Sequence, residues 1–242
     1  MPATPDSNDH RPRVAAERRE RMRRRLIESA MIVFAAKGVG ASVIPDVVAA
    51  AEVSQGSFYN YFRTNEDLLA AVSNELSSDM IVLIESAVGA IADPSLRVAT
   101  GTRCYLHLVR SHRLLARFLA GAGLRLVGAG KEAREESAVY HFLPADLEEG
   151  QKRGDFVDAP VDTLVDIIKG AGLVAIDRMA HGRVAKSYPD PIVAGMLRAL
   201  GVPPDAAARL SVQPLPRLVP AADSLLARVQ ARVAAAEAHA AA

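Results

Sequence analysis

Apolar residues recur at helical spacing along nearly the whole chain, and this pattern constrains the fold more than any other feature. Leu26, Ile27, Ala30, Val33 and Phe34, for example, lie three and four residues apart and form one stripe on a helix. No segment shows the alternation that is typical of a strand. Half of the 242 residues are hydrophobic, which suffices for a large buried core and excludes a wholly disordered chain. We therefore expect an all-α protein.

The composition also excludes several classes of protein. Cys104 is the only cysteine, so an internal disulfide framework and a cysteine-based zinc site are excluded. No run of about 18 apolar residues could span a membrane, and the N-terminus lacks the apolar core of a signal peptide. We expect a cytoplasmic protein with no membrane partner, no metal and no other cofactor.

Residues that end or cap helices divide the first part of the chain. A first helix is predicted from about residue 17 to Lys37, with Gly38 as its stop. Ser42 is expected to cap a second short helix, and Ser54 a third one after a tight break. A long fourth helix is then expected to start at Thr64 or Asn65 and to run to about Ile91.

Two short helices joined by a tight turn form a helix-turn-helix, whose second helix lies in the major groove of DNA. In the second of these helices, Phe58 and Phe62 are four residues apart and share a face that can pack inward. Gly56 leaves room for a close backbone approach. The other side chains carry groups that suit bases and phosphates: Gln55, Ser57, Tyr59, Asn60 and Tyr61. The alternative is that they only solvate a surface helix.

The charge distribution favours an anionic partner at the N-terminal end. Residues 1–63 carry ten Arg and Lys against seven Asp and Glu, whereas the remainder is slightly acidic. Eight arginines lie between His10 and Arg25. Arg11 and Arg13 could form a flexible arm in a minor groove, with Arg24 or Arg25 near phosphates. The alternative is that most of these arginines are solvated, or that their mutual repulsion shortens the helix.

The segment GVGASVIPDVVAAAEVSQGSFYNYFRTNEDLLAAV is similar to the DNA-binding segment of TetR-family (tetracycline-repressor-like) transcriptional regulators. The similarity covers roughly residues 20 to 75, and Gly56, Tyr59, Tyr61 and Phe62 fall in register with the family pattern. The resemblance implies an N-terminal three-helix helix-turn-helix domain. It also implies a larger helical domain for effector binding and dimerisation.

The resemblance assigns a role to each position of the DNA-binding set. Ser42 and Val43 lie where the family contacts a phosphate. Gln55 and Ser57 lie where it contacts bases, and the two tyrosines anchor the DNA backbone. The whole set comprises Arg24, Ser42, Val43, Ser54, Gln55, Gly56, Ser57, Tyr59, Asn60, Tyr61 and Asn65.

Three residues depart from the family pattern. Glu52 stands where the family often has glycine, so we expect a left-handed backbone there at a cost of roughly 1 kcal/mol. Asn65 stands where the family often has lysine, which removes a charged phosphate contact but leaves an amide that could donate. Asn60 stands where Tyr or His is common, so its contact stays open.

The remaining chain is predicted to be helical. Asp93 and Pro94 begin a fifth helix that runs to about Arg110. Another helix is expected over residues 131–153 and another pair from Val161 and from Asp190. By resemblance this pair forms a dimer interface, whereas the residues alone favour an internal core. The interface set comprises Leu164, Ile167, Ile168, Ala171, Val174, Ala175, Ile192 and Met196.

The family would hold a small-molecule effector between the reading helix and the dimer helices. Large or polar residues in otherwise apolar helices are the candidates, although each alone is more often core or surface. They are Met80, Tyr105, His107, Leu108, Phe118, Arg125, Tyr140, Phe142 and Met179. No metal cluster is predicted around Cys104 and His107.

These expectations define four regions and a leading function. Residues 1–16 form a disordered basic arm, 17–63 the helix-turn-helix domain, 64–220 the ligand-binding and dimerisation domain, and 221–242 an Ala-rich helix or tail that frays. The function predicted is a repressor that binds a palindromic double-stranded DNA operator as a homodimer and is released by a small-molecule effector. The alternative is a DNA-binding architectural or regulatory protein without an effector. No catalytic constellation is present, so we expect no enzyme.

Overall fold

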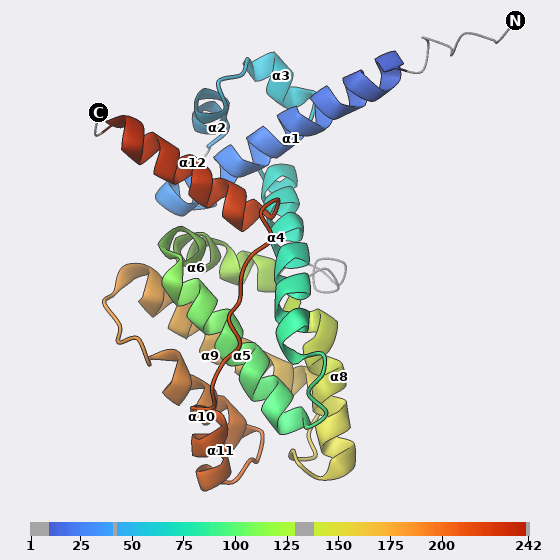
Figure 1. Cartoon of the computed structure of the whole chain (residues 1–242), viewed down its shortest axis with the longest axis vertical. Coiled ribbons are helices and arrows are strands. Elements are labelled where there is room, and N and C mark those ends of the chain that lie inside the picture. The colour runs from blue at the N-terminus through green and yellow to red at the C-terminus, as the bar shows by residue number, and fades with distance from the viewer. Residues whose placement is uncertain (1–9, 41–42, 129–137, 241–242) are drawn as a thin grey trace, which may run out of the picture.

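The computed structural model describes residues 10–40, 43–128 and 138–240, and within these ranges it contains helices and loops but no strand. The all-α prediction is confirmed. We call residues 10–63 the head and residues 64–210 the body, and Figure 1 shows the head above the body, with one long helix running from one to the other. None of the described helices is long and apolar enough to cross a membrane.

The head consists of α1 (His10–Lys37), α2 (Ile44–Ala51) and α3 (Gln55–Tyr59). Its core is formed by the apolar stripe of α1 together with Phe58 and Phe62, whose ring centroids lie 6.0 Å apart. Leu26, Ile27 and Phe34 are completely buried in it. The 3.6-residue periodicity of the sequence therefore predicted the buried face of α1 correctly.

Helix α1 begins at His10, so the disordered arm predicted for residues 1–16 is corrected over residues 10–16. Arg13 lies 3.5 Å from Glu17, and Arg24 lies 3.0 Å from Glu20. These i,i+4 pairs place a carboxylate between arginines and offset the repulsion that was expected to shorten the helix. Residues 1–9 lie outside the described ranges.

Local signals set most of the other helix boundaries. Gly38 ends α1 with φ +83°, and Glu52 ends α2 in the left-handed conformation with φ 51° and ψ 49°. The hydroxyls of Ser54 and Thr64 accept from the backbone N–H groups three residues later and so cap α3 and α4. The N-cap of α2 is Val43 and not Ser42, which lies outside the described residues.

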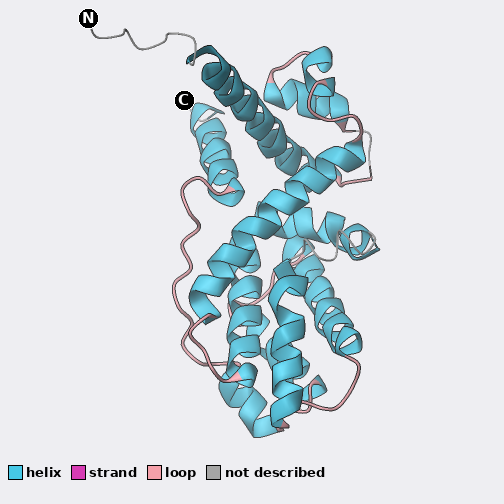
Figure 2. Ribbon diagram, turned by 90° about the vertical axis from the view of Figure 1, so that its right-hand side faces the viewer, coloured by secondary structure: helices cyan, strands magenta, loops and turns pink. Residues whose placement is uncertain are grey.

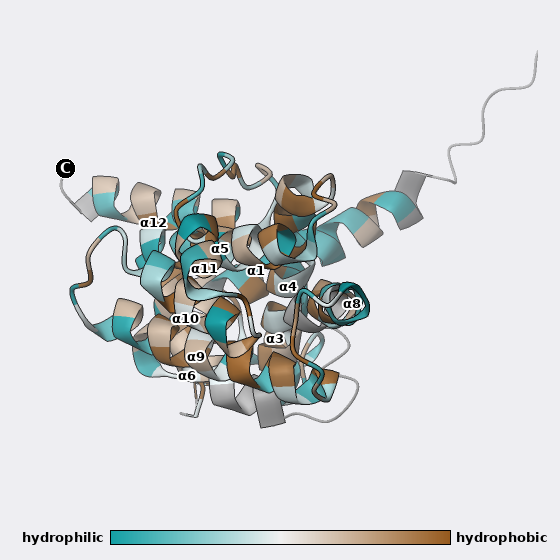
Figure 3. Cartoon of the chain, turned by 90° about the horizontal axis from the view of Figure 1, so that it is seen from below, coloured by the Kyte–Doolittle hydropathy of each residue, from teal (hydrophilic) through white to brown (hydrophobic). Residues whose placement is uncertain are grey.

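The body is a bundle of six helices around α4 (Asn65–Val88). They are α5 (Pro94–Ser111), α6 (Arg113–Gly128), α8 (Ala138–Arg153), α9 (Val161–His181), α10 (Pro189–Ala199) and α11 (Pro204–Leu210). Seen from below, each helix carries both hydrophilic and hydrophobic residues (Figure 3), as expected for helices with one buried face. Asp93 caps α5 as predicted. Helix α8 continues through Pro144, and Lys131, the predicted start of this helix, lies outside the described residues.

Helix α6 joins the body to the head. It packs against α9 on one side and against α1 on the other. The rings of Phe34 on α1 and Phe118 on α6 lie 6.3 Å apart, and both side chains are fully buried. The head therefore shares a continuous hydrophobic core with the body.

The C-terminal segment packs on the head, which the sequence did not predict. After α11, residues 211–224, which we call the strap, run along the outside of the body back to the head (Figures 1 and 2). Helix α12 (Leu225–Ala240) then packs against α1 and α4. Leu225, Leu226 and Val229 are buried in this contact. Residues 221–242 were expected to form an Ala-rich helix or tail that frays, and the structure has a helix from Leu225 to Ala240.

Candidate DNA-binding surface and interior cavity

Helix α3 presents a polar face that is supported from behind by two phenylalanines. Phe58 is completely buried and Phe62 is 5% exposed, whereas Gln55 and Asn60 are exposed and Tyr59 is 48% exposed. The ring of Phe58 also meets the ring of Tyr59 edge-on, with centroids 5.4 Å apart. The helix is thus fixed in place while its hydrogen-bonding groups remain in solvent.

The first turn of α3 is held by two serines. The Ser54 hydroxyl accepts from the backbone N–H of Ser57 at 3.1 Å, and the two hydroxyls lie 2.9 Å apart. Next to them, a Cβ placed on Gly56 would have no atom within 4 Å. The backbone at this position is therefore open to a close approach from outside.

The other residues of the predicted DNA-binding set differ in how accessible they are to a DNA duplex. Arg24 is exposed and paired with Glu20. Tyr61 is half-buried against the head core. The Val43 side chain is completely buried, so any phosphate contact there would come from its backbone.

Asn65 is engaged within the chain. Its side-chain amide donates to the carbonyl of Val39 at 3.1 Å, while its Oδ1 is buried without a partner among the described residues. One of its two N–H donors is therefore used to hold the loop after α1, and only the other could reach a phosphate.

The turn between α2 and α3 contains the left-handed Glu52 that the family comparison led us to expect. The carboxylate of Glu52 lies 2.5 Å from Arg25 on α1. This ion pair balances the negative charge that Glu52 would otherwise place beside the polar face of α3.

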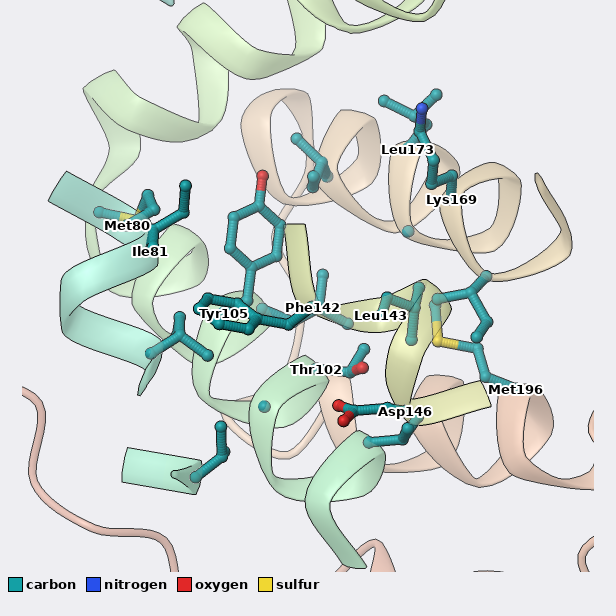
Figure 4. A pocket seen from close by; sticks show the side chains of 18 of the residues that line it. Met80, Ile81, Thr102, Tyr105, Phe142, Leu143, Asp146, Lys169, Leu173 and Met196 are labelled. Atoms are coloured by element: carbon teal, nitrogen blue, oxygen red, sulfur yellow. The ribbon is translucent and has the colours of Figure 1, made fainter. Parts of the chain in front are cut away.

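The body contains a partly open cavity of about 210 Å³ between α4, α5, α6, α8, α9 and α10 (Figure 4). Three of the predicted effector residues line it, namely Met80, Tyr105 and Phe142. The rest of the wall is mainly aliphatic, with Met196 of α10 also contributing. A cavity of this kind is suited to a small, largely apolar molecule.

A few polar groups interrupt the apolar wall. Arg97 donates from Nε to Oδ1 of Asp146 at 2.6 Å and from Nη1 to the Ile91 carbonyl at 2.8 Å. Burial raises the pKa of Asp146, against the opposing effect of the Arg97 bond. Burial also raises the pKa of Tyr105 to about 12, so its hydroxyl keeps its proton. Thr102 adds a further hydroxyl to the wall.

Four predicted effector residues do not line the cavity. His107 instead bonds through Nε2 to Asp190 at 2.9 Å, and Arg103 bonds the same carboxylate oxygen at 3.0 Å. Burial alone would raise the pKa of Asp190, but these bonds together outweigh it and lower the pKa. Leu108, Phe118 and Met179 are core residues outside the cavity wall. The side chains of Arg125 and Tyr140 lie outside the described part of the structure.

The residues predicted for a dimer interface separate into two groups. Leu164, Ile168, Ala175 and Met196 are buried inside this chain and cannot reach a partner in this structure. Ile167 and Val174 are 42% and 60% exposed on α9, Ala171 is exposed between them, and Ile192 is half-buried. The exposed members follow each other at spacings of four and three on a single face of α9.

Metal-ligating residues do not cluster in the described ranges, where no group of three or more His, Cys, Asp or Glu side chains could hold an ion. Cys104 is buried, and burial raises the pKa of its thiol to about 11. The thiol is therefore protonated at neutral pH and is a poor metal ligand or nucleophile.

Comparison with known proteins identifies the class of this chain. The sequence pattern of bacterial regulatory proteins of the tetR family matches residues 26–72, which include α2, α3 and their supporting helices. The transcriptional repressor DhaR of Mycobacterium sp. strain GP1 is 37% identical over 76 residues. That alignment spans 31% of this chain and 38% of DhaR, so less than half of the relative is matched.

Solved structures extend the likeness to the body. RolR in complex with resorcinol superposes with a TM-score of 0.61 at 26% identity, over 84% of this chain and all of RolR. RolR without ligand gives 0.62 at 29% identity, over 81% of this chain and all of RolR. KstR2 of Mycobacterium tuberculosis, at 19% identity and a TM-score of 0.56 over 74% of this chain and 94% of its own, shares the fold.

The helix-turn-helix head on a larger helical body defines the chain as a bacterial transcriptional regulator by class. More narrowly, its head is similar to the DNA-binding segment of the tetR family, and its body is similar to that of RolR.

Proposed function

We propose that the chain is a repressor that binds a palindromic DNA operator as a homodimer and is released when a small molecule occupies the body cavity. The observation that carries this proposal is the face of α3. Gln55 and Tyr59 are exposed, Gly56 is open, and Phe58 and Phe62 fix the helix from behind. This is the arrangement that a helix in the major groove requires. A DNA-binding regulator works where the DNA is, so the proposal includes a cytoplasmic location.

Two observations support a homodimer: the small number of bases that one short helix can contact, and the exposed apolar residues of α9. One five-residue helix offers few base contacts, whereas two such helices about 34 Å apart can contact both halves of a palindrome. Ile167, Ala171 and Val174 form an exposed apolar stripe away from the head. Covering this stripe with a second copy would remove it from water.

Release by an effector is supported by the cavity and by RolR, a structural relative whose complex contains resorcinol. The cavity wall includes α4 and α6, and both helices also pack against α1 of the head. A ligand that binds better to one spacing of the two heads than to another would shift the protein away from the operator.

Selection of bound sequences from a random pool of DNA duplexes tests the proposal. The full-length protein should enrich a palindrome whose half-sites lie about one helical turn apart. An effector should then lower the affinity for that palindrome. Failure to enrich any sequence in dilute salt, where phosphate contacts are strongest, would overturn the proposal. A palindrome that no small molecule releases would instead favour a DNA-binding protein without an effector.

A further inference from the structure

The size of the body cavity limits what it can hold. A dry apolar cavity of about 150 Å³ accommodates benzene, whereas drug-sized ligands occupy pockets of about 300 to 1,000 Å³. The cavity here measures about 210 Å³. It therefore fits a single ring with a few small substituents and is small for burying a steroid-sized or long-chain molecule.

The charged groups of the wall already have partners. The Arg97 guanidinium is bound to Asp146 and to the Ile91 carbonyl. Lys169, on the α9 side of the cavity, also takes part in an interaction. A charged ligand would lose its hydration without gaining an unpaired counter-charge, so an uncharged ligand is favoured.

Two polar groups of the wall remain able to orient such a ligand. A carboxylate has about four acceptor sites, and Arg97 uses one of those on Asp146. In Figure 4, Thr102 on α5 and Asp146 on α8 lie on the same side of the cavity, while the Tyr105 hydroxyl points away from them. A ligand hydroxyl placed there could donate to Asp146 and exchange a hydrogen bond with Thr102.

We propose that the cavity takes a small uncharged ring molecule that carries at least one hydroxyl group, with Asp146 and Thr102 as the partners of that hydroxyl. The apolar walls then bury the ring, and the hydroxyl links α5 to α8. A ring without a hydroxyl would leave the Asp146 carboxylate poorly solvated, so it binds more weakly. This inference rests on the proposed function, because it names the effector class of the same cavity.

Thermal unfolding of the full-length protein with three matched probes tests the ligand class. The probes are resorcinol, m-xylene, which replaces both hydroxyls of resorcinol with methyl groups, and benzoate, which carries a charge. A ligand that binds only the folded state raises Tm, and at equal concentration the tighter ligand raises it more. We expect resorcinol to raise Tm more than either other probe at equal concentration. An equal or larger shift with m-xylene or benzoate, or no shift with resorcinol, overturns the inference.

Two variants locate the hydroxyl partners. Thr102→Val keeps the shape of the side chain and removes its hydroxyl, so it should weaken resorcinol binding roughly 3- to 10-fold and leave m-xylene binding unchanged. Thr163→Val, at an exposed position of α9, is the matched control. Asp146→Asn provides a second variant that retains an acceptor but loses the charge. Resorcinol affinities unchanged in both cavity variants would remove Thr102 and Asp146 from the site.

Operator binding by the ligand-free protein separates failure of this inference from failure of the proposed function. Protein that selects a palindrome but shows no preference for resorcinol over m-xylene would contradict the ligand class alone. Protein that binds none of the duplexes would contradict the regulator itself, whatever occupies the cavity.

Discussion

At the scale of single residues, Gly56 is a position where the fold itself does not explain the residue type. The fold does not require glycine there, because φ is not positive and a Cβ would meet no atom within 4 Å. Alanine would even favour the helix by up to about 1 kcal/mol. The fold itself thus gives no reason for glycine at this position, whereas the DNA duplex that we propose lies against α3 would give one.

Gly56→Ala should consequently separate folding from DNA binding. We expect Tm to stay the same or to rise, while operator affinity falls by at least about tenfold, because the added methyl group collides with the duplex. Thermal unfolding and a DNA-binding titration measure the two effects. Unchanged operator affinity would show that α3 does not approach DNA at this position.

Substitutions of Gln55 and of Tyr59 should have different effects on DNA affinity. Tyr59→Phe removes a hydroxyl that we propose contacts a phosphate, so binding should weaken on every duplex by a similar factor. Gln55→Ala removes a base contact and should lower affinity for the preferred operator by about 1–3 kcal/mol with little effect on scrambled DNA. Titration of each variant on both duplexes provides the measurement. Equal losses on the two duplexes for Gln55→Ala would contradict its base-reading role.

Glu52 allows the cost of a left-handed residue to be measured. Glu52→Gly and Glu52→Gln both remove the exposed ion pair with Arg25, but only glycine relieves the backbone at φ 51°. The ion pair contributes about 0–1 kcal/mol, so the two variants should differ by roughly 1 kcal/mol, with glycine the more stable. Chemical denaturation compares them. Equal stability would mean that the turn is not strained.

What could be predicted at this scale depended on sequence distance. The pair of Phe58 and Phe62 was predictable because helix geometry brings residues four apart onto one face. The left-handed Glu52 was predictable from the resemblance, because the family often has glycine at this position. The bond from Asn65 to Val39 and that from His107 to Asp190 join residues 26 and 83 positions apart. No periodicity specifies such partners, so His107 was wrongly placed at the cavity.

At the scale of whole helices, the predicted caps of α3, α4 and α5 were correct, whereas the cap of α2 and the packing of the C-terminal segment were not predicted. The starts of α3, α4 and α5 follow from side-chain oxygens that bond a nearby backbone N–H. Helix α12 is ordered for a different reason, since its N-terminal Leu225 donates to Asp79 of α4 and its arginines reach α1. An Ala-rich segment is weakly stable alone, so the packing partner decides whether it frays.

Arg228 is the main polar link between α12 and the rest of the molecule. It donates to Glu28 of α1 at 2.6 Å and to Glu75 of α4 at 2.5 Å, with all three side chains largely buried. Arg232 continues this contact to the Ser29 hydroxyl at 2.8 Å and to the carbonyl of Ala50 in α2. Helix α12 thus touches three helices that position α3.

Arg228→Gln should therefore loosen α12. Loss of two charge-assisted bonds predicts a destabilisation of about 1–3 kcal/mol and faster proteolytic cleavage within the strap. Arg217→Gln, on the exposed strap itself, is the matched control and should behave like the unchanged protein. Cleavage rates and Tm that match between the two variants would show that the Arg228 bonds do not hold α12.

At the scale of the whole molecule, the chain does not bury all of its apolar surface with its own helices. The apolar residues of α9 predicted an internal core or, by resemblance, a dimer interface, and they could not say which residues this chain covers with its own helices. Leu164 and Ile168 pack into the body, whereas Ile167 and Val174 remain exposed. Sequence patterns specify that a face must be buried and leave open whether the same chain or a second copy buries it.

Val174→Asp should decide whether a second copy covers that face. A carboxylate on the exposed stripe would be buried in the proposed dimer but solvated in the monomer, so it should dissociate the dimer without unfolding the body. Operator affinity should fall sharply, because two linked heads are replaced by one. Val82→Asp, at a position on α4 that is 71% exposed compared with 60% for Val174, is the matched control. Sedimentation and DNA titration of both variants provide the measurement, and a Val174→Asp protein that remains dimeric would place the interface elsewhere.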